Sequence, residues 1–345
     1  MIDRGGPTVG ELGEDGVLPR VLRRLGAAAA SEVGPGDDCA VLRVSGDAVV
    51  TSDTMIEGPD FRLAWHDGFE LGWKLAATNL SDVAAMAATP TALTVSLAVP
   101  HDTPVVLLER IAEGLDAACR ALAPGCGIVG GDLGRAPVVT AAVTAIGELA
   151  GARPVLRSGA RPGDVLAYAG ELGLAGLGLS LLFAEAAEAD GTAHDRTLGE
   201  LWARHPEALA AQLAPTPPIP LGPAAGRAGA SAMMDVSDSL AIDAHRLARA
   251  SGVRLRLDRA RLEAAFGRQH GAEVPLEAML TGGEDHGLLA TFPEGIAPPA
   301  GFAVIGSVEG SAATGAAEAR VRLDEEPLEA RGWDPYRVWP PGSGS

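Results

Sequence analysis

The stretch LGWKLAATNLSDVAAMAATPTALTVSLAVP, residues 71–100, combines the two periodicities from which the fold is built. Its first part carries apolar and small residues at helical spacing as far as Pro90, and this pattern predicts a long helix. Its second part, ALTVSLAVP (92–100), is a β-rich apolar run that predicts a strand. Asp82 falls in the helical part, which is too apolar to face solvent on all sides.

The same alternation extends outward in both directions. Besides 92–100, the predicted strands are 39–44, 48–52, 127–132, 138–149, 165–170, 230–236, 253–257 and 288–292. The predicted helices lie around LPRVLRRLGAAAASEV (18–33, within 1–35) and at 71–89, 105–123, 178–189 and 237–250, with one more between 257 and 288. Strands alternate with helices and some neighbouring strands pair directly, so the pattern predicts an α/β or α+β fold.

The segment GARPVLRSGARPGD (151–164) interrupts this pattern with glycine, proline and arginine, and it is the best candidate for a domain boundary. A chain of 345 residues is also long enough for two domains. We therefore predict an N-terminal α/β domain over residues 1–150 and a C-terminal α/β domain over 151–339. Residues 340–345, PGSGS with its preceding proline, are predicted to be a flexible tail.

Composition excludes several classes of protein. The formal net charge of −18 disfavours binding to nucleic acid or to anionic lipid. No apolar run reaches the ~18 residues that a membrane-spanning helix needs, and the N-terminus lacks the pattern of a secretory signal. The three cysteines, Cys39, Cys119 and Cys126, are odd in number and lack metal-ligand spacing, so we expect reduced thiols in a cytoplasmic protein.

Aspartates follow apolar β-rich runs at several points in the chain. Asp53 follows AVVTS, Asp132 follows GIVGG, and Asp235 follows SAMM, with Asp238 three residues later. Each one alone is explained by a turn or a helix cap, and Asp238 in particular could cap the next helix. Ligand sites of α/β sheets gather at strand ends, however, and two carboxylates ~4 Å apart repel by roughly 4 kcal/mol at an effective dielectric near 20. A converging set would therefore need Mg²⁺ or Ca²⁺.

Paired glycines precede two of the acidic motifs. Gly130 and Gly131 precede Asp132, and the pair 282–283 precedes Glu284. Glycine lets backbone N–H groups approach an anion closely, although a tight turn explains each pair equally well. The run GELGLAGLG (170–178) has the same two explanations. The chain has no GxxxxGK[ST] motif and no protein-kinase motif set, which excludes those two nucleotide-binding folds.

Taken in order, these motifs resemble the thiamine-monophosphate kinase family, within the superfamily of aminoimidazole ribonucleotide synthetase and selenophosphate synthetase. The motifs that carry the resemblance are GPGDDCAVL (34–42), TSDTMIEG (51–58), KLAATNLSDVAAMAATP (74–90), VGGDLGR (129–135), LRSGARPGD (156–164), MMDVSDSL (233–240) and LTGGEDH (280–286), with GWDPY (332–336) as a final piece.

The resemblance implies a two-domain aminoimidazole-ribonucleotide-synthetase-like fold whose N-terminal sheets pair into a dimer barrel. It implies that ATP phosphorylates thiamine monophosphate to thiamine diphosphate by direct transfer, assisted by several Mg²⁺ ions, in a homodimer. No side chain is expected to act as a covalent relay, because phosphoryl transfer needs mainly positioning and charge neutralisation.

The resemblance also implies a role for each matching residue. The implied metal ligands are Asp38, Thr51, Ser52, Asp53, Asp82, Asp132, Asp235 and Asp238. The implied ATP contacts are Gly131, Asp132, Arg157 and Ser237. The implied substrate contacts are Asp60, Glu284 and Trp333. The family often has His where this chain has Asp60, so the chain departs from the pattern there.

Two other functions fit parts of the sequence. Another ATP-dependent enzyme of the superfamily, similar to aminoimidazole ribonucleotide synthetase, would share the acidic motifs. The reactive N-terminal Cys of selenophosphate synthetase and the C-terminal cysteine motif of the hydrogenase maturation relatives have no counterpart, since the cysteines lie at 39, 119 and 126. A non-catalytic nucleotide-binding regulator would keep the fold, but it would not need so many metal ligands.

Overall fold

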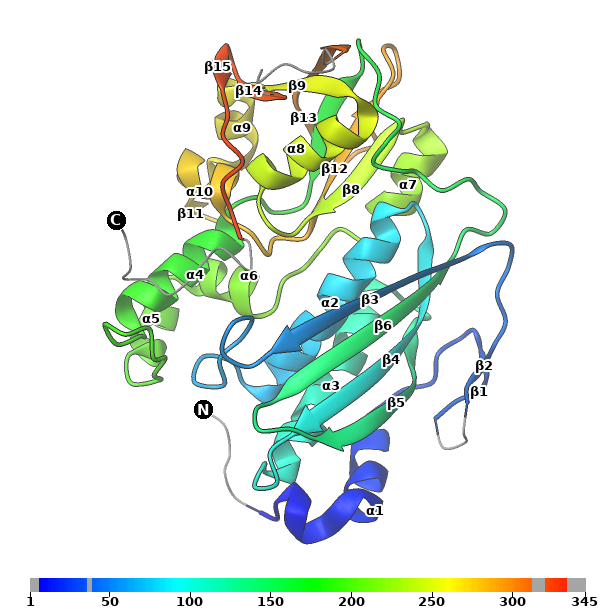
Figure 1. Ribbon diagram of the computed structural model, residues 1–345, viewed down its shortest axis with the longest axis vertical. Helices are drawn as coiled ribbons and strands as arrows, with labels where there is room; N and C mark the ends of the chain where they lie inside the picture. The colour runs from blue at the N-terminus through cyan, green and yellow to red at the C-terminus, as the bar shows by residue number, and fades with distance from the viewer. Residues whose placement is uncertain (1–5, 36–38, 312–319, 334–345) are drawn as a thin grey trace.

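The computed structural model describes residues 6–35, 39–311 and 320–333, and its two large β-sheets follow one another along the chain (Figure 1). The first sheet belongs to the N-terminal half, whose elements are α1 (Val9–Leu22), β1 (Ser31–Val33), β2 (Val41–Leu42), β3 (Ala48–Ile56), α2 (Gly68–Ala85), β4 (Thr89–Val99), α3 (Val105–Leu122), β5 (Gly127–Arg135) and β6 (Thr140–Glu148). Its strand order is β3-β6-β4-β5, and all neighbours are antiparallel except β4 and β5.

Helices α2 and α3 cover one face of this sheet (Figure 1). Helix α2 begins at a capping box, in which the Asp67 side chain accepts from the Glu70 N–H at 2.7 Å and Glu70 accepts from the Asp67 N–H at 2.8 Å. The two helices cross at glycines: a side chain on Gly72 would collide with the Ile111 carbonyl, and one on Gly114 with the Phe69 carbonyl. This close approach buries α2 along nearly its whole length.

No helix among the described residues covers the other face of the first sheet (Figure 1). Burial alternates strictly along β6, so every second side chain lies on that face. On the edge strand β3, the apolar side chains of Val50 and Ile56 are 64% and 39% exposed. The strands β3 and β5 form the two edges of this sheet.

The second sheet belongs to the C-terminal half and has seven strands in the order β15-β14-β9-β13-β7-β12-β8. The strands are β7 (Val165–Ala169), β8 (Ala232–Val236), β9 (Val253–Leu257), β12 (Gly287–Phe292), β13 (Phe302–Ser311), β14 (Val321–Leu323) and β15 (Glu326–Pro327), and a separate pair is formed by β10 (Arg268–Gln269) and β11 (Ala272–Glu273). The helices are α4 (Leu174–Glu185), α5 (Leu198–Arg204), α6 (Pro206–Leu213), α7 (Leu221–Ala228), α8 (Leu240–Ser251), α9 (Arg259–Phe266) and α10 (Leu276–Thr281). Only β9 and β14 are parallel.

Both faces of the second sheet are buried, and α2 takes part in covering one of them. Leu166, Met234 and Leu289 pack on the side of α4, α8 and α9. On the opposite side, residues such as Met233 and Phe292 belong to one apolar cluster with α7 and with Ala85 at the end of α2. Helix α2 thus packs against both sheets. The two-domain mixed α/β fold that the sequence predicts is confirmed.

Several predicted boundaries are wrong. The first helix ends at Leu22 rather than continuing through the alanines, and the Gly26 N–H beyond it donates to Asp116 at 2.7 Å. Strands β3 and β5 do not end at Asp53 and Asp132: they continue to Ile56 and Arg135, because β6 and β4 supply hydrogen-bonding partners throughout. The strands β13, β14 and β15 and the helices α5, α6 and α10 have no counterpart in the sequence prediction.

No helix in the described part of the chain combines the length and the apolar character needed to cross a membrane.

The α2–α3 crossing can be tested by Gly72→Ala. The added methyl group would meet a backbone carbonyl that cannot move aside alone, so we expect a loss of about 2 kcal/mol or more of folding stability. Thermal unfolding should show Tm lowered by about 3 °C or more. Gly199→Ala is the matched control, because Gly199 lies in α5 with nothing within 4 Å of the new methyl group. Equal Tm values for the two variants would contradict the close helix crossing.

Candidate active site

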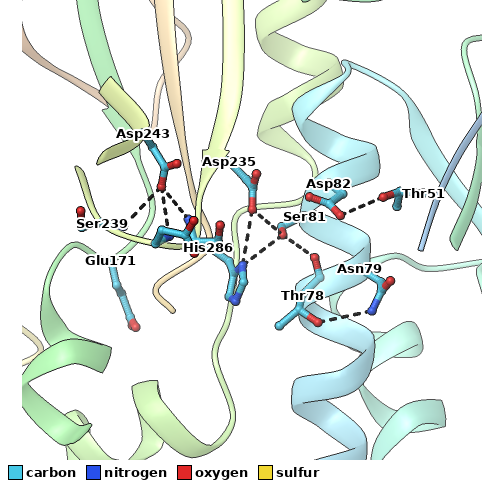
Figure 2. Close-up of polar contacts among 12 residues, drawn as sticks. Thr51, Thr78, Asn79, Ser81, Asp82, Glu171, Asp235, Ser239, Asp243 and His286 are labelled. Atoms are coloured by element: carbon cyan, nitrogen blue, oxygen red, sulfur yellow. Dashed lines mark hydrogen bonds and ion pairs between the residues drawn. The ribbon is translucent and has the colours of Figure 1, made fainter. Parts of the chain in front are cut away.

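A cluster of polar side chains joins α2 and β3 of the first half to β8 and the 282–286 turn of the second (Figure 2). The Thr51 hydroxyl donates to Oδ2 of Asp82 at 3.0 Å. Asp235 lies opposite, with its Oδ2 3.5 Å from Nδ1 of His286 and 3.5 Å from the Ser81 hydroxyl. The structure therefore brings Thr51, Asp82 and Asp235 together from three separate motifs.

The acidic groups of this cluster oppose one another's ionisation. Burial raises the pKa of Asp82 to about 7, and the carboxylate of Asp235 adds to the shift. Desolvation also raises the pKa of Asp53. The Thr54 N–H and His286 lower this pKa, whereas the nearby carboxylates of Asp235 and Asp238 raise it further. Burial alone would lower the pKa of His286, but Asp235 raises it above its ordinary value. The carboxylates of the cluster thus outnumber its one nearby imidazole, that of His286.

This arrangement suits a hard divalent cation in its chemistry, because its donors are carboxylate and hydroxyl oxygens with excess negative charge. Among residues 6–35, 39–311 and 320–333, however, no three His, Cys, Asp or Glu side chains are grouped so that they could hold one metal ion between them.

The turn between β8 and α8 is organised around Asp243. Its Oδ2 accepts from the backbone N–H groups of Ser237 at 3.1 Å and Asp238 at 3.1 Å. The Arg246 guanidinium bridges Asp238 at 2.5 Å and Asp243 at 2.7 Å. Burial raises the pKa of Asp243 to about 6. The Arg246 guanidinium therefore partly compensates the charge of Asp238. The Ser237 N–H is already bound to Asp243 and is not free for a ligand.

A second polar group lies at the other end of the site. Lys74 is fully buried in α2, and its ammonium donates to Oε2 of Glu284 at 2.8 Å and to the Gln212 carbonyl at 3.0 Å. The Gln212 side-chain amide also donates to Glu284. Burial raises the pKa of Glu284, but the Lys74 ammonium and the Gln212 amide lower it below its ordinary value. Glu284 is therefore a carboxylate held in place from two elements.

Asp60 lies near this end of the site. Its Oδ2 accepts from the Ile56 N–H at 2.8 Å, and burial followed by the charge of Glu284 raises its pKa. Arg62 lies close by, with its guanidinium 4.8 Å from the ring centre of Trp65 and 4.6 Å from that of Phe183.

Trp333 is anchored beside the β8–α8 turn. Its backbone N–H donates to the Asp238 carbonyl at 2.9 Å, and the Ser239 hydroxyl donates to the Arg331 carbonyl at 2.7 Å. A side chain on Gly332 would collide with the same turn. Residues 331–333 thus pack against the turn that carries Asp238.

Other predicted residues lie apart from this cluster. Asp132 on β5 is aligned with Ser96 on β4, then Ala142 on β6, then Thr54 on β3. Three strand spacings therefore separate Asp132 from the edge strand that carries Asp53, or ~14 Å at ~4.8 Å each.

Gly131 and Asp132 instead lie beside an apolar cavity of about 770 Å³ at the β5 edge. Its other walls come from α1, β2, β4 and α3, with side chains such as Leu22, Leu42 and Leu115. The cavity is thus distinct from the Asp82–Asp235 cluster of the same chain.

Three further predicted residues are accounted for as follows. The Ser52 hydroxyl donates to the Val143 carbonyl at 3.1 Å, and strand alternation places it on the opposite face from Thr51. Arg157 is exposed, and its carbonyl accepts from Ser251 at the far end of α8 from Asp238. Asp38 lies outside the described residues.

Four residues of the site were not among the predicted ligands: Gln212, Asp243, His286 and Lys74, the last having been expected only as a salt-bridge partner. His286 directly follows the GGED motif and Asp243 lies in the first turn of the helix after MMDVSDSL, so both were within reach of motif analysis. Gln212 lies in a helix without any motif, and only the tertiary structure reveals its contact with Glu284.

Family models match both halves of the chain: AIR synthase related protein, N-terminal domain, over residues 36–149, and AIR synthase related protein, C-terminal domain, over 161–296. The thiamine-monophosphate kinase of Mycobacterium tuberculosis is 38% identical over 96% of this chain and 92% of its own length. That of Aquifex aeolicus is 32% identical, with coverages of 94% and 98%.

Solved structures show the same similarity. Thiamine-monophosphate kinase from Stenotrophomonas maltophilia superposes with a TM-score of 0.70 at 29% identity, covering 91% of this chain and 96% of that one. AaThiL complexed with AMPPCP and TMP superposes with a TM-score of 0.68 at 29% identity, with coverages of 95% and 98%.

The crowding of the acidic cluster can be tested by Asp82→Asn in protein freed of metal and nucleotide. The pKa of Asp82 in the folded protein, about 7, exceeds its ordinary value of 3.8, so folding favours the protonated form and ionisation destabilises the fold as the pH rises from 4 to 7. The variant should therefore have a higher Tm than the parent at pH 8, by several degrees or roughly 1–3 kcal/mol, and nearly the same Tm near pH 4.

Asp132→Asn is the matched control, because this exposed aspartate on β5 lies outside the cluster and should leave Tm unchanged at both pH values. A Tm for Asp82→Asn at pH 8 that is equal to or below that of the parent would contradict the crowding.

Proposed function

The chain belongs to the thiamine-monophosphate kinase family of AIR synthase-related proteins, and from this premise we propose how its residues divide the work between two copies of the chain. The reaction is the ATP-dependent phosphorylation of thiamine monophosphate to thiamine diphosphate. The observation that carries the proposal is the joining of Asp82 and Asp235 across the two halves, while Glu284 lies fixed at the other end of the site.

We propose that the acidic cluster receives the phosphate of thiamine monophosphate together with Mg²⁺. Thr51, Asp53, Asp82 and Asp235 would hold the ions, since their oxygens are hard ligands, and burial together with neighbouring carboxylates raises the pKa of Asp53 and Asp82. Bound Mg²⁺ would neutralise the negative charge of the ATP phosphates and of the thiamine monophosphate phosphate, so that the two can approach. Asp38, Ser52 and Asp238 are kept as further ligands on the family resemblance alone.

The protein's own contribution is then mainly orientation. The acceptor is a phosphate oxygen that is already ionised at neutral pH, so no side chain needs to act as a strong general base. We propose that Glu284 contacts the thiamine moiety, with Trp333 and Asp60 as neighbouring walls. Because the Lys74 ammonium and the Gln212 amide both donate to Glu284, its carboxylate is set in one orientation before the substrate arrives.

We propose that the cavity beside Gly131 and Asp132 receives the adenosine part of ATP. Its walls are mainly leucine, isoleucine and valine side chains, which suit a flat aromatic base, and its glycines admit phosphates close to the backbone. Arg157 and Ser237 are kept as further ATP contacts on the resemblance.

The ~14 Å between Asp132 and the strand that carries Asp53 then requires a second copy of the chain. In a closed dimer barrel, the free edge β5 of one copy would meet the free edge β3 of the other, and Asp132 would approach the acidic cluster of its partner. The uncovered sheet face, with exposed Val50, supports this barrel because it would become the interior. The free thiols of Cys39, Cys119 and Cys126 support a cytoplasmic location.

The metal proposal is tested with purified protein, ATP, thiamine monophosphate and Mg²⁺, with thiamine diphosphate measured by chromatography. We expect product that disappears with a chelator and returns with Mg²⁺, and a loss of at least about 100-fold in turnover for Asp53→Asn. Asp190→Asn, in an exposed loop of the C-terminal half, is the control and should keep full activity. Near-normal turnover by Asp53→Asn at saturating Mg²⁺ would refute the metal role. ATP binding without product would favour a regulator instead.

The shared site is tested by mixing two inactive variants, Asp53→Asn and Asp132→Asn. If Asp132 serves the partner's cluster, each mixed dimer has one site with both substitutions and one site with neither. After unfolding and refolding together in equal amounts, about a quarter of the wild-type activity should return. If both aspartates serve the site of their own chain, every site stays defective and the mixture stays inactive.

A further inference from the structure

The turn formed by Glu284, Asp285 and His286 has an unusual backbone. Glu284 has φ = 71° and His286 has φ = 53°, so two non-glycine residues on either side of Asp285 lie in the left-handed region. Side chains other than glycine rarely adopt this region, and such conformations persist only where the surroundings enforce them. The neighbours of this turn should therefore show what enforces it.

Asp285 is the part of the turn that points into the second half of the protein. It is 4% exposed, and its Oδ2 accepts from the Gly173 N–H at 2.6 Å while its Oδ1 accepts from the Ala175 N–H at 2.8 Å. These N–H groups belong to the first turn of α4, whose end carries partial positive charge. The glycine run at 170–178 thus forms the start of α4, and the N–H groups of Gly173 and Ala175 within it are already bound by Asp285 and are not available to a phosphate.

The two flanking side chains leave the turn toward opposite ends of the site. Glu284 contacts the Lys74 ammonium, and His286 lies 3.5 Å from Asp235 in the acidic cluster. The backbone of the turn is also tied to β8, since the Glu284 N–H donates to Ser237 at 2.8 Å and the His286 N–H to Val236 at 3.1 Å. The bonds to α4 on one side and to residues 236–237 on the other hold the turn in a single orientation.

We propose that Asp285 is a positioning residue for the phosphoryl transfer, which it serves by holding Glu284 toward the thiamine moiety and His286 toward Asp235. The inference rests on the proposed contact between Glu284 and the substrate. Without the two bonds to α4, the flanking residues would relax out of the left-handed region. Glu284 would then turn away from its place beside Lys74, and substrate affinity would fall although Glu284 itself is unchanged.

The test measures the affinity for thiamine monophosphate by titration calorimetry, so it does not depend on turnover. Asp285→Asn replaces one of the two acceptor oxygens by a donor and should weaken binding by roughly 5–50-fold, as leaving a buried N–H group without its acceptor does. The affinity for AMPPCP should stay within about 2-fold of the parent value. Asp258→Asn is the matched control, because Asp258 caps α9 at 3.0 Å in the same way but lies outside the site.

A double-mutant cycle with Glu284→Gln separates positioning from general damage. If Asp285 acts through Glu284, the affinity of the double variant for thiamine monophosphate should equal that of the single variant with the lower affinity. Additive losses, or an unchanged affinity together with a lowered Tm, would overturn the proposal and leave Asp285 a purely structural cap.

Asp285→Ser, which retains a helix-capping group but only one short acceptor, covers the case in which Asp285→Asn does not fold. Failure of both variants to fold would likewise overturn the proposal. Absence of thiamine diphosphate from the parent protein's reaction would refute the proposed function separately, because the binding measurements do not depend on turnover.

Discussion

The burial of α2 between the two sheets is the constraint on which the rest of the structure depends. The helix packs on α3 through Gly72, and its C-terminal end joins the apolar cluster beneath the second sheet. Its lysine, Lys74, is therefore far from solvent and must be paired, because an isolated buried ammonium is very costly. Glu284 is the partner that meets this need, and their 2.8 Å contact links the two halves. Asp82, two turns further along the same helix, is placed opposite Asp235 by the same packing.

The sequence predicted the elements that have strong periodicity and failed where tertiary pairing decides the outcome. The helix and strand within 71–100 were found because small and apolar residues there follow clear periods, and α2 and β4 are the result. The extents of β3 and β5 were missed, since Asp53 and Asp132 resemble strand ends in composition. Their neighbours in the sheet nevertheless extend the ladder by three residues beyond each aspartate.

The candidate site shows a similar division. Motifs identified Asp82, Asp235 and Glu284, but sequence order carries no distance, so it could not show that Asp132 lies three strands away. Gln212 has no motif at all, and in a helical pattern a glutamine is usually assigned to the surface. It is buried because its amide and its backbone carbonyl both serve the Lys74–Glu284 pair, which is a relation between residues far apart in the chain.

The bond between the Trp333 N–H and the Asp238 carbonyl has a consequence for biosynthesis. Every other described residue named in the candidate site precedes Trp333 in the chain, so Trp333 is the last of them to leave the ribosome. All strands of both sheets precede it and can form on the nascent chain before it. The contact between Trp333 and the β8–α8 turn is thus a late event of translation. Chains that end between Leu328 and Arg331 would retain the strands of both sheets and would lack this contact.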